Sequence, residues 1–278
     1  MPSAEDQGAG GLSGPAAGPP PAGGFVDSQK RGRTWVEVGV LLALLVALVL
    51  ALRGCSGCVA GAVVSALPPD VDAKIGQAGG AAMRAQHSMN ADASADDQAR
   101  ATRIFDELRG KLTPEETRVL VAPRLTVIVD DQVNAFALPG GEVFVLTGLL
   151  ERTGGDDDML RGVLAHELGH AVHRHGVRGL VRSGVYGLGL ALVLGSSDDI
   201  VATLVAGASQ LDQLGHSREM EEEADAFGVD LLRRCGHNSE GLARFLESLE
   251  SAPVPQLLST HPDSKDRAKR IRQMDGAR

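Results

Sequence analysis

The sequence predicts a predominantly helical α+β fold with a small β-sheet, preceded by one membrane anchor near the N-terminus. Residues 38–52 form an unbroken run of apolar side chains. Residues 125–129 and 142–147 are rich in apolar and β-branched residues and are bounded by Pro, Gly or Asp, which is typical of short strands. Apolar residues recur at helical spacing in 99–112 and in most of the chain after residue 148. We therefore expect two strands, paired as a hairpin or as neighbours, within a mostly helical domain.

The composition excludes several classes of protein. The 278 residues carry a net charge of −9 and only 3% aromatic residues, whereas nucleic-acid binders need a basic surface and often aromatic rings for base stacking. We expect no nucleic-acid partner. Three cysteines are too few for a disulfide scaffold. Cys55 and Cys58 form one isolated C-x-x-C pair, which excludes a zinc site with four thiolate ligands, and Cys235 is expected in or near the core.

The N-terminal third has the composition of a tail, an anchor and a linker. Residues 1–34, rich in Gly, Pro and Ala, are expected to be a disordered cytoplasmic tail. Residues 35–52 are expected to form a transmembrane or signal-anchor helix, because their helical length approaches the thickness of a bilayer core. Residues 53–98 would then supply a linker and an N-terminal helix, and residues 99–278 the main domain.

The charges around the apolar run predict its orientation. Basic residues at 30, 31 and 33 precede the run, so the N-terminus is expected to stay in the cytoplasm and the main domain to lie outside the inner membrane. Two alternatives give the same topology: a cleaved secretory signal, or an exported lipoprotein acylated at Cys55. Whether Cys55 is acylated, paired with Cys58 or free stays open at this point.

The strongest chemical signal is the motif H-E-x-x-H at residues 166–170. Histidines at positions i and i+4 share one face of a helix, so His166 and His170 can bind one zinc ion through imidazole nitrogens. Glu167, beside the first histidine, can take the proton of an attacking water. The helix is expected to start at the three aspartates 156–158, whose charges suit a helix N-terminus. A helical wheel places its apolar stripe roughly opposite the two histidines, which argues against a role in the core.

A second helix, expected to begin at Ser217, supplies a third ligand. Its apolar stripe consists of Met220, Ala224, Phe227 and Leu231. Glu221 and Asp225 lie four residues apart at the edge of that stripe, where a half-buried carboxylate pair needs a compensating positive charge. We therefore expect Glu221 to be the third zinc ligand and Asp225 to orient a ligand histidine through its other ring nitrogen. The remaining glutamates of 219–223 are expected to face water.

Four ordered blocks of sequence resemble a known family. They are NAFALPGG at 134–141 with FV at 144–145 and TGLL at 147–150; VLAHELGH at 163–170 with RH at 174–175; SR at 217–218 with Glu221 and AD at 224–225; and THP at 260–262 with Arg267. In these blocks the chain resembles the HtpX-like zinc metallopeptidases of peptidase family M48, especially the BepA-like branch that faces the bacterial periplasm. The resemblance implies a zincin-like metallopeptidase domain of the gluzincin type, with one Zn²⁺ per chain.

The resemblance also implies roles for individual residues. His166, His170 and Glu221 would be the metal ligands, and Glu167 would be the general base of a metal-assisted peptide hydrolysis. His261 and Arg218 are candidates for stabilising the transition state; the alternatives are a histidine at a helix start and a surface salt bridge. The substrate-binding edge strand would comprise Gly141, Glu142, Val143, Phe144 and Val145, the alternative being an ordinary interior strand.

Together these features predict a membrane-tethered zinc-dependent metalloendopeptidase. Its partners would be protein or peptide substrates, namely envelope proteins under quality control, and the lipid bilayer through residues 35–52. It would sit in the bacterial inner membrane as a single-pass protein with its catalytic domain on the periplasmic side. The alternative is a latent enzyme, or a non-cleaving chaperone-like module that uses the same zinc groove. In the latent form, His261 or a lid within residues 184–215 would occupy the open zinc position.

Overall fold

The computed structural model describes residues 35–44, 56–87, 93–183, 205–208, 211, 215–251, 257, 260–261 and 264–276. The chain divides into two compact units, residues 1–53 and residues 54–278. The predictions for the tail at 1–34, for Cys55 and for most of the lid at 184–215 fall outside the described residues.

In the first unit, residues 35–44 form a helix that is exposed along its whole length. All the large hydrophobic side chains that are strongly exposed in the described residues, apart from Val121, belong to this helix, with Trp35 73% exposed. Among the described residues, no helix is both long enough and apolar enough to cross a membrane. The remainder of the expected anchor, residues 45–52, lies outside the described part of the chain.

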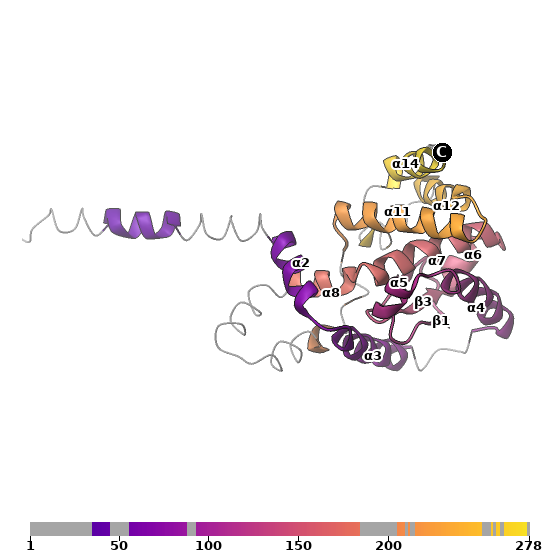
Figure 1. Cartoon of the computed structure of the whole chain (residues 1–278), viewed down its shortest axis with the longest axis horizontal. Coiled ribbons are helices and arrows are strands. Elements are labelled where there is room, and N and C mark those ends of the chain that lie inside the picture. The colour runs from indigo at the N-terminus through magenta and orange to yellow at the C-terminus, as the bar shows by residue number, and fades with distance from the viewer. Residues whose placement is uncertain are drawn as a thin grey trace, which may run out of the picture. The chain divides into compact units, whose positions relative to one another are not determined.

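The second unit contains ten helices and three strands in its described residues. The helices are α2 (Ser56–Ala66), α3 (Pro69–Gln86), α4 (Ala95–Arg109), α5 (Pro114–Val119), α6 (Thr147–Arg152), α7 (Asp157–Val172), α8 (His175–Ser183), α11 (Arg218–Arg234), α12 (Glu240–Ser251) and α14 (Ser264–Gly276). The strands are β1 (Arg124–Ile128), β2 (Ala135–Ala137) and β3 (Glu142–Leu146). This arrangement confirms the prediction of a predominantly helical α+β domain with a small sheet (Figure 1).

The sheet has the strand order β1-β3-β2. The two expected strands are indeed neighbours, but they run parallel, with Thr126 opposite Phe144. The short strand β2, which the sequence analysis missed, pairs with β3 in the antiparallel direction. The prediction that residues 141–145 form an edge strand is therefore wrong, and the interior alternative holds. Every residue of β3 is buried because helices cover both faces of the sheet.

Glycines make the tight turn between β2 and β3. Gly140 and Gly141 have φ angles of +84° and +96°, a region that side-chain-bearing residues rarely adopt. The amide of Gly141 donates to the Leu138 carbonyl at 3.0 Å, and the amide of Leu138 donates to the Glu142 carbonyl at 2.7 Å. The turn thus fixes the register of β2 and places it beside helix α7.

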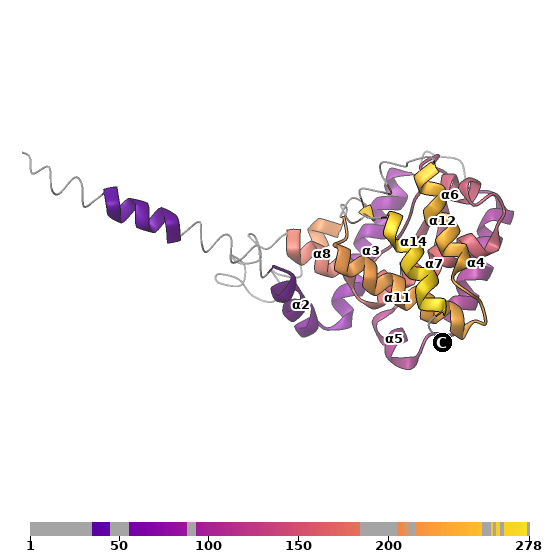
Figure 2. The ribbon, with the colours of Figure 1, turned by 90° about the horizontal axis from the view of Figure 1, so that it is seen from above.

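Two hydrophobic clusters lie on opposite faces of the sheet. Val143 and Val145 point into the larger cluster, which includes residues of α4, α7, α11 and α12. Phe144 points into the smaller cluster, formed with α2, α3 and α8. This alternation follows from the two-residue period of a strand. Helix α7 crosses the larger cluster and packs against α11, α12 and β2. Figures 1 and 2 show α7 beside α11 and α12.

The segment expected to hold a linker and one helix is part of the domain. Residues 56–86 form α2 and α3, whose apolar side chains belong to the smaller cluster. The Arg174 guanidinium donates to the Asp72 carboxylate and to the carbonyls of Val64 at 2.7 Å and Leu67 at 3.0 Å. Arg174 therefore joins the segment directly after α7 to both N-terminal helices.

Candidate metal centre

Helix α7 carries the H-E-x-x-H motif and is buried on nearly all its faces. Asp156 caps it, its carboxylate accepting from the amides of Asp158 and Met159, as the acidic start predicted. The side chains of His166, Glu167 and His170 are buried rather than surface-facing, because α11, α12 and the sheet surround the helix. Opposite the apolar stripe there is thus a buried polar site.

Helix α11 approaches α7 closely enough to add its own side chains to this site. Ser217 caps α11 through a bond from the Met220 amide at 3.4 Å. A Cβ on Gly169 would lie only 3.0 Å from the Cα and carbonyl oxygen of Ala224. A Cβ on Gly228 would lie 3.2 Å from the His166 amide nitrogen. The two glycines therefore permit the short interhelical distance that brings Glu221 to the histidines.

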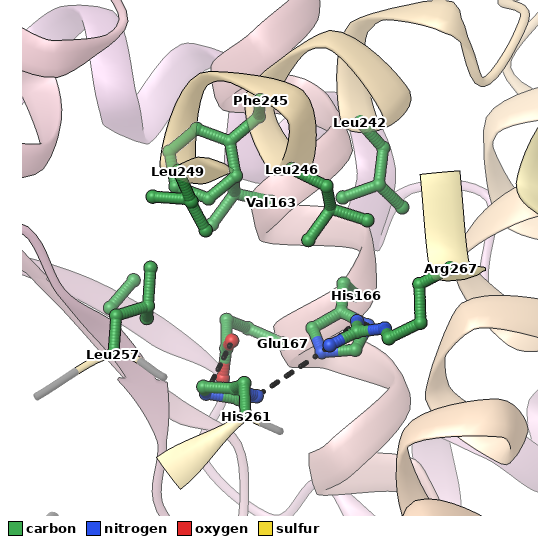
Figure 3. Close-up of a pocket in the computed structure, with 11 residues that line it drawn as sticks. Val163, His166, Glu167, Leu242, Phe245, Leu246, Leu249, Leu257, His261 and Arg267 are labelled. Carbon is green, nitrogen blue, oxygen red and sulfur yellow. Dashed lines mark hydrogen bonds and ion pairs between the residues drawn. The ribbon is translucent and has the colours of Figure 1, made fainter. Parts of the chain in front are cut away.

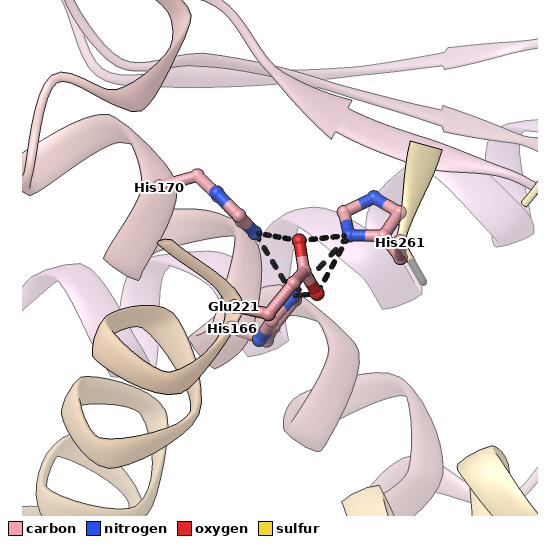
Figure 4. Close-up of side chains that lie close together, drawn as sticks. All are labelled: His166, His170, Glu221 and His261. Atoms are coloured by element: carbon pink, nitrogen blue, oxygen red, sulfur yellow. Dashed lines mark hydrogen bonds and ion pairs between the residues drawn. The ribbon is translucent and has the colours of Figure 1, made fainter. Parts of the chain in front are cut away.

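Four buried side chains converge on one point: His166, His170, Glu221 and His261 (Figure 4). His166 Nε2 lies 3.0 Å from His170 Nε2 and 3.5 Å from Glu221 Oε2. His170 Nε2 lies 3.4 Å from Glu221 Oε1. His261 Nδ1 lies 3.1 Å from Glu221 Oε1 and 3.5 Å from His166 Nε2.

These distances fit a tetrahedral zinc ion. Zinc–nitrogen and zinc–oxygen bonds of about 2.0–2.1 Å imply about 3.3 Å between neighbouring ligand atoms of a tetrahedron. The five separations given above, 3.0–3.5 Å, bracket that value, and one ligand atom from each of the four residues lies within 4.8 Å of the others. Imidazole nitrogens and a carboxylate oxygen are also the donors that zinc prefers in metallopeptidases. The cluster can therefore hold zinc without rearrangement of its backbone.

A buried arginine and aspartate support the cluster from one side. Asp225 Oδ1 lies 3.1 Å from His166 Nδ1, the ring nitrogen that faces away from the convergence point. Arg267, 1% exposed, donates to Asp225 through Nε at 2.8 Å and Nη2 at 2.7 Å. Its Nη1 forms an ion pair of 2.5 Å with Glu221 Oε2. Asp225 thus lies where it can fix the His166 ring, and Arg267 holds both carboxylates.

A second chain of contacts supports His170. Its Nδ1 lies 2.9 Å from His175 Nδ1, and His175 Nε2 lies 2.8 Å from Glu223 Oε2. Arg178 Nη1 donates to the same Glu223 oxygen at 2.6 Å. The prediction that Glu223 faces water holds only in part: its side chain is 36% exposed, but it pairs with His175 and Arg178 of α8. The sequence analysis also missed His216, whose ring stacks on that of His170.

Glu167 lies between the cluster and the free edge of β2. Its Oε2 accepts a bond from the Ala137 amide at 3.1 Å, and its Oε1 lies 3.8 Å from His261 Nε2. Burial is the main cause that raises the pKa of the Glu167 carboxyl above its usual value. This carboxyl is thus poised to exchange a proton closer to neutral pH than a solvated glutamate.

The two motif histidines differ in their affinity for protons. Burial lowers the pKa of both, but hydrogen bonds with Asp225 and Glu221 outweigh it at His166 and raise its pKa to about 9. At His170, burial and the neighbouring histidines together lower the pKa well below its usual range. Metal binding at such a site displaces the proton from His166.

The two candidates for transition-state stabilisation lie in different places. His261 is 7% exposed and belongs to the cluster through Nδ1. Arg218 is exposed in the first turn of α11 and is outside the four-residue cluster. His261 is therefore the only one of the two that the described structure places at the convergence point.

An apolar pocket adjoins the cluster (Figure 3). Its polar lining consists of His166, Glu167, His261 and Arg267, and its apolar lining of Ala135, Val163, Leu242, Phe245, Leu246, Leu249 and Leu257. Four of the apolar residues come from one face of α12, at spacings of three and four residues. That periodicity is visible in the sequence but is equally typical of a core helix.

Known proteins are similar to the part of the chain that contains the metal centre. The sequence family described as Peptidase family M48 matches residues 96–275, nearly two thirds of the chain. The Beta-barrel assembly-enhancing protease of Escherichia coli (strain K12) is 31% identical over 196 residues, which cover 62% of this chain and 40% of that protein.

Two further relatives are similar over a shorter stretch. Metalloprotease YcaL of Escherichia coli (strain K12) is 34% identical over 161 residues, covering 52% of this chain and 59% of that protein. The Mitochondrial metalloendopeptidase OMA1 of Arabidopsis thaliana is 37% identical over 152 residues, covering 53% of this chain and 30% of that protein. The chain thus spans between 30% and 59% of the length of these three relatives.

Proposed function

The chain belongs to peptidase family M48, and on that premise we propose that it acts as a membrane-tethered zinc metalloendopeptidase on envelope proteins. Its class, a zinc metalloendopeptidase, follows from the family match and from the relatives that carry metalloprotease names. Zinc as its cofactor follows from the family and from the buried cluster of three histidines and Glu221. The single observation that carries the proposal is this cluster, with Glu167 directly beside it.

We assign the metal to His166, His170 and Glu221. Zinc, when bound, polarises the scissile carbonyl and makes water a stronger nucleophile at neutral pH. Glu167 takes the proton of the attacking water and then delivers it to the nitrogen of the leaving amine. The raised pKa of Glu167 supports this double role, because a carboxyl with a low pKa would release the proton to solvent. Asp225 and Arg267 keep His166 and Glu221 in position.

The substrate backbone would pair with β2 rather than with β3. In an antiparallel pair, the backbone N–H and C=O groups of successive residues point alternately toward the partner strand and away from it. Those of Phe136 point toward β3, and those of Ala135 and Ala137 point toward the free edge. The bond from the Ala137 amide to Glu167 is consistent with that direction. An extended peptide added to this edge would lie across Glu167 and the cluster, which is the geometry of β-strand addition.

The membrane and envelope parts of the proposal have separate support. The apolar run 38–52 follows basic residues, and the described helix 35–44 exposes Trp35 and several valines and leucines to its surroundings. Such side chains are stable in contact with lipid and costly in water. The relative named as a beta-barrel assembly-enhancing protease supports an envelope substrate for this chain. Quality control of envelope proteins would be the corresponding role.

The test uses the full chain, purified in detergent, together with Glu167→Gln. We expect about one zinc per chain in both proteins and cleavage of casein by the parent alone. Absence of zinc from both proteins would overturn the ligand assignment and the function together. Extraction of cell membranes at alkaline pH tests the tether separately: a tethered chain stays with the membrane fraction, and a released chain contradicts the anchor.

A specific observation favours the latent alternative as a second candidate. His261 Nδ1 lies within the cluster, 3.1 Å from Glu221 Oε1, in the place where a catalytic zinc site keeps a position open. If His261 occupies the coordination position that substrate or water needs, His261→Ala should cleave casein faster than the parent. An equal or slower rate would count against latency. A chaperone-like module would instead suppress aggregation equally well in the parent and in Glu167→Gln, with no cleavage by either.

A further inference from the structure

We propose that Asp72 and Arg174 are positioning residues of the metal centre: their ion pair fixes the turn after α7 so that His175 holds the ligand His170 in place. This inference rests on the proposed function, in which His170 binds the metal, and adds to it two residues outside the four-residue cluster. Asp72 belongs to α3, which precedes the residues 96–275 that match peptidase family M48. A part of the chain outside the family match would therefore help to hold the metal.

The backbone at Arg174 has an unusual conformation. Its φ of +55° is the only positive φ at a residue other than glycine in the described part of the chain. Residues with a side chain adopt this left-handed region at an energetic cost, because Cβ then approaches the following carbonyl oxygen. Such a conformation persists only where the surrounding contacts impose it. It lets the chain end α7 at Val172 and begin α8 at His175, with only two residues between the helices.

The side chain of Arg174 supplies contacts that can impose this conformation. Its Nε lies 3.0 Å from Asp72 Oδ1 and its Nη2 donates to Asp72 Oδ2. Its Nη1 donates to the carbonyls of Val64 at 2.7 Å and Leu67 at 3.0 Å. The side chains of Arg174 and Asp72 are only 13% and 1% exposed, and loss of either would leave the other charge buried without compensation. The pair therefore holds the Arg174 backbone in its unusual conformation.

His175, the next residue, carries this restraint to the metal site. Its side chain is fully buried, and its Nδ1 lies 2.9 Å from His170 Nδ1. The Arg174 carbonyl accepts from the Arg178 amide at 3.0 Å, so the same peptide unit also starts the first turn of α8. If Arg174 relaxed to a negative φ, the direction of His175 would change and His170 would lose the group that orients its ring.

Helix α3 also supports the strand that contacts Glu167. A Cβ on Gly76 of α3 would collide with the Pro139 carbonyl oxygen, so the helix lies directly against the turn that follows β2. The Ala137 amide of β2 donates to Glu167 at 3.1 Å. The same helix thus contacts the segments beside both His170 and Glu167, which is consistent with a role in positioning the centre.

The experiment measures the zinc affinity of the full-length protein by competition with a chromogenic chelator. We expect Asp72→Asn to weaken zinc binding by about tenfold or more, as is typical when a group that orients a metal ligand is lost. The new amide fills the same volume but carries no charge to balance Arg174. In the His175→Phe background, the same substitution should change the affinity by less than about twofold, because the path to His170 is already broken.

This comparison separates positioning from a general structural role. Equal weakening by Asp72→Asn in the parent and in His175→Phe would show that the effect does not pass through His175, and would overturn the proposal. Unchanged affinity in Asp72→Asn alone would overturn it as well. A parent protein that binds no zinc would instead overturn the proposed function, and this inference with it.

Variants of two buried arginines provide a matched control. Arg174→Met should weaken zinc binding more than Arg174→Lys, because lysine keeps a positive charge beside Asp72. Arg161→Met makes the same change at a buried arginine near the start of α7, which pairs with Asp158 and Glu107 and is outside the metal cluster. It should lower stability but leave zinc affinity unchanged. Equal weakening in Arg161→Met and Arg174→Met, or equal affinities in Arg174→Lys and Arg174→Met, would overturn the assignment.

Discussion

His170 and His175 face each other through their Nδ1 atoms at 2.9 Å. Two imidazoles can approach in this way only when one nitrogen carries a proton and the other accepts it. Because His170 directs Nε2 to the metal cluster, its Nδ1 must be the donor and His175 Nδ1 the acceptor. The remaining proton of His175 is then on Nε2, where Glu223 Oε2 lies at 2.8 Å. One carboxylate thus fixes the tautomers of two histidines in sequence.

Replacing His175 by phenylalanine should weaken zinc binding by about 10–100-fold, the usual effect of losing a group that orients a metal ligand. The ring volume is retained, but His170 loses its acceptor. His175→Asn should retain most of the affinity because its amide oxygen can accept in place of Nδ1. Competition with a chromogenic chelator measures the affinity.

The control for this prediction is His87→Phe, which changes a partly buried histidine paired with Asp130, outside the metal cluster. It should leave zinc affinity unchanged. Equal affinity in the parent and in His175→Phe would show that the His170–His175 contact does not orient the ligand.

Arg267→Met should destabilise the protein by about 3–5 kcal/mol, because it leaves Glu221 and Asp225 buried without their common cation. Urea unfolding in the presence of a chelator measures this loss without the added stability that bound zinc provides. Arg272→Met, at an exposed arginine that pairs with Glu240 and Glu247, should cost far less stability because both ion pairs lie in solvent. Similar losses in both variants would mean that the buried ion pairs add nothing beyond surface pairing.

Gly169→Ala should force α7 and α11 apart, because its Cβ would stand 3.0 Å from the Ala224 backbone. We expect a loss of about 1–3 kcal/mol in stability, typical of an overpacked contact, and weaker zinc binding because Glu221 moves with α11. Gly61→Ala is the matched control: it lies in α2 with nothing within 4 Å of the new Cβ, and it should stabilise the helix by up to about 1 kcal/mol. Unchanged zinc affinity in Gly169→Ala would contradict the packing argument.

The features that the sequence predicted well are those with a local signal. Ser217 was recognisable as a helix cap, and the aspartates 156–158 as the start of a helix, because both signals depend on residues within one turn. The i, i+4 spacing of His166 and His170 likewise fixes their common face before any tertiary contact forms. Asp225 could be predicted near the metal ligands because a buried carboxylate needs a positive charge close to it, and the metal site supplies one.

The features that the sequence did not reveal depend on contacts between distant segments. Strand β2 is three residues long, too short for a periodic signal, and it alone moved β3 from the expected edge to the centre of the sheet. The pairing of Glu223 was not visible in the sequence because its partner His175 lies 48 residues earlier. The leucines of α12 have an ordinary core pattern, and only the fold shows that they surround a space beside Glu167.

Glu116 provides a pH-dependent prediction for the helix that carries Glu221. It accepts from the Thr113 amide in a capping box, and its two oxygens pair with Arg234 at the end of α11 at 2.8 and 3.0 Å. Burial alone would raise its pKa, but the bonds from Arg234 and Thr113 outweigh burial and lower it below the usual value. A lowered folded-state pKa stabilises the protein above the unfolded-state value of about 4.3, and the contribution is lost as the pH falls through the folded-state pKa.

Glu116→Gln should therefore be less stable than the parent by about 1–2 kcal/mol at pH 7, and the difference should shrink as the pH falls below about 4.3. Urea unfolding across this pH range measures the difference. Glu115→Gln changes the exposed neighbour in the same turn and should stay within about 0.5 kcal/mol of the parent throughout. If the loss of stability in Glu116→Gln does not vary with pH, the negative charge of Glu116 beside Arg234 does not stabilise the end of α11.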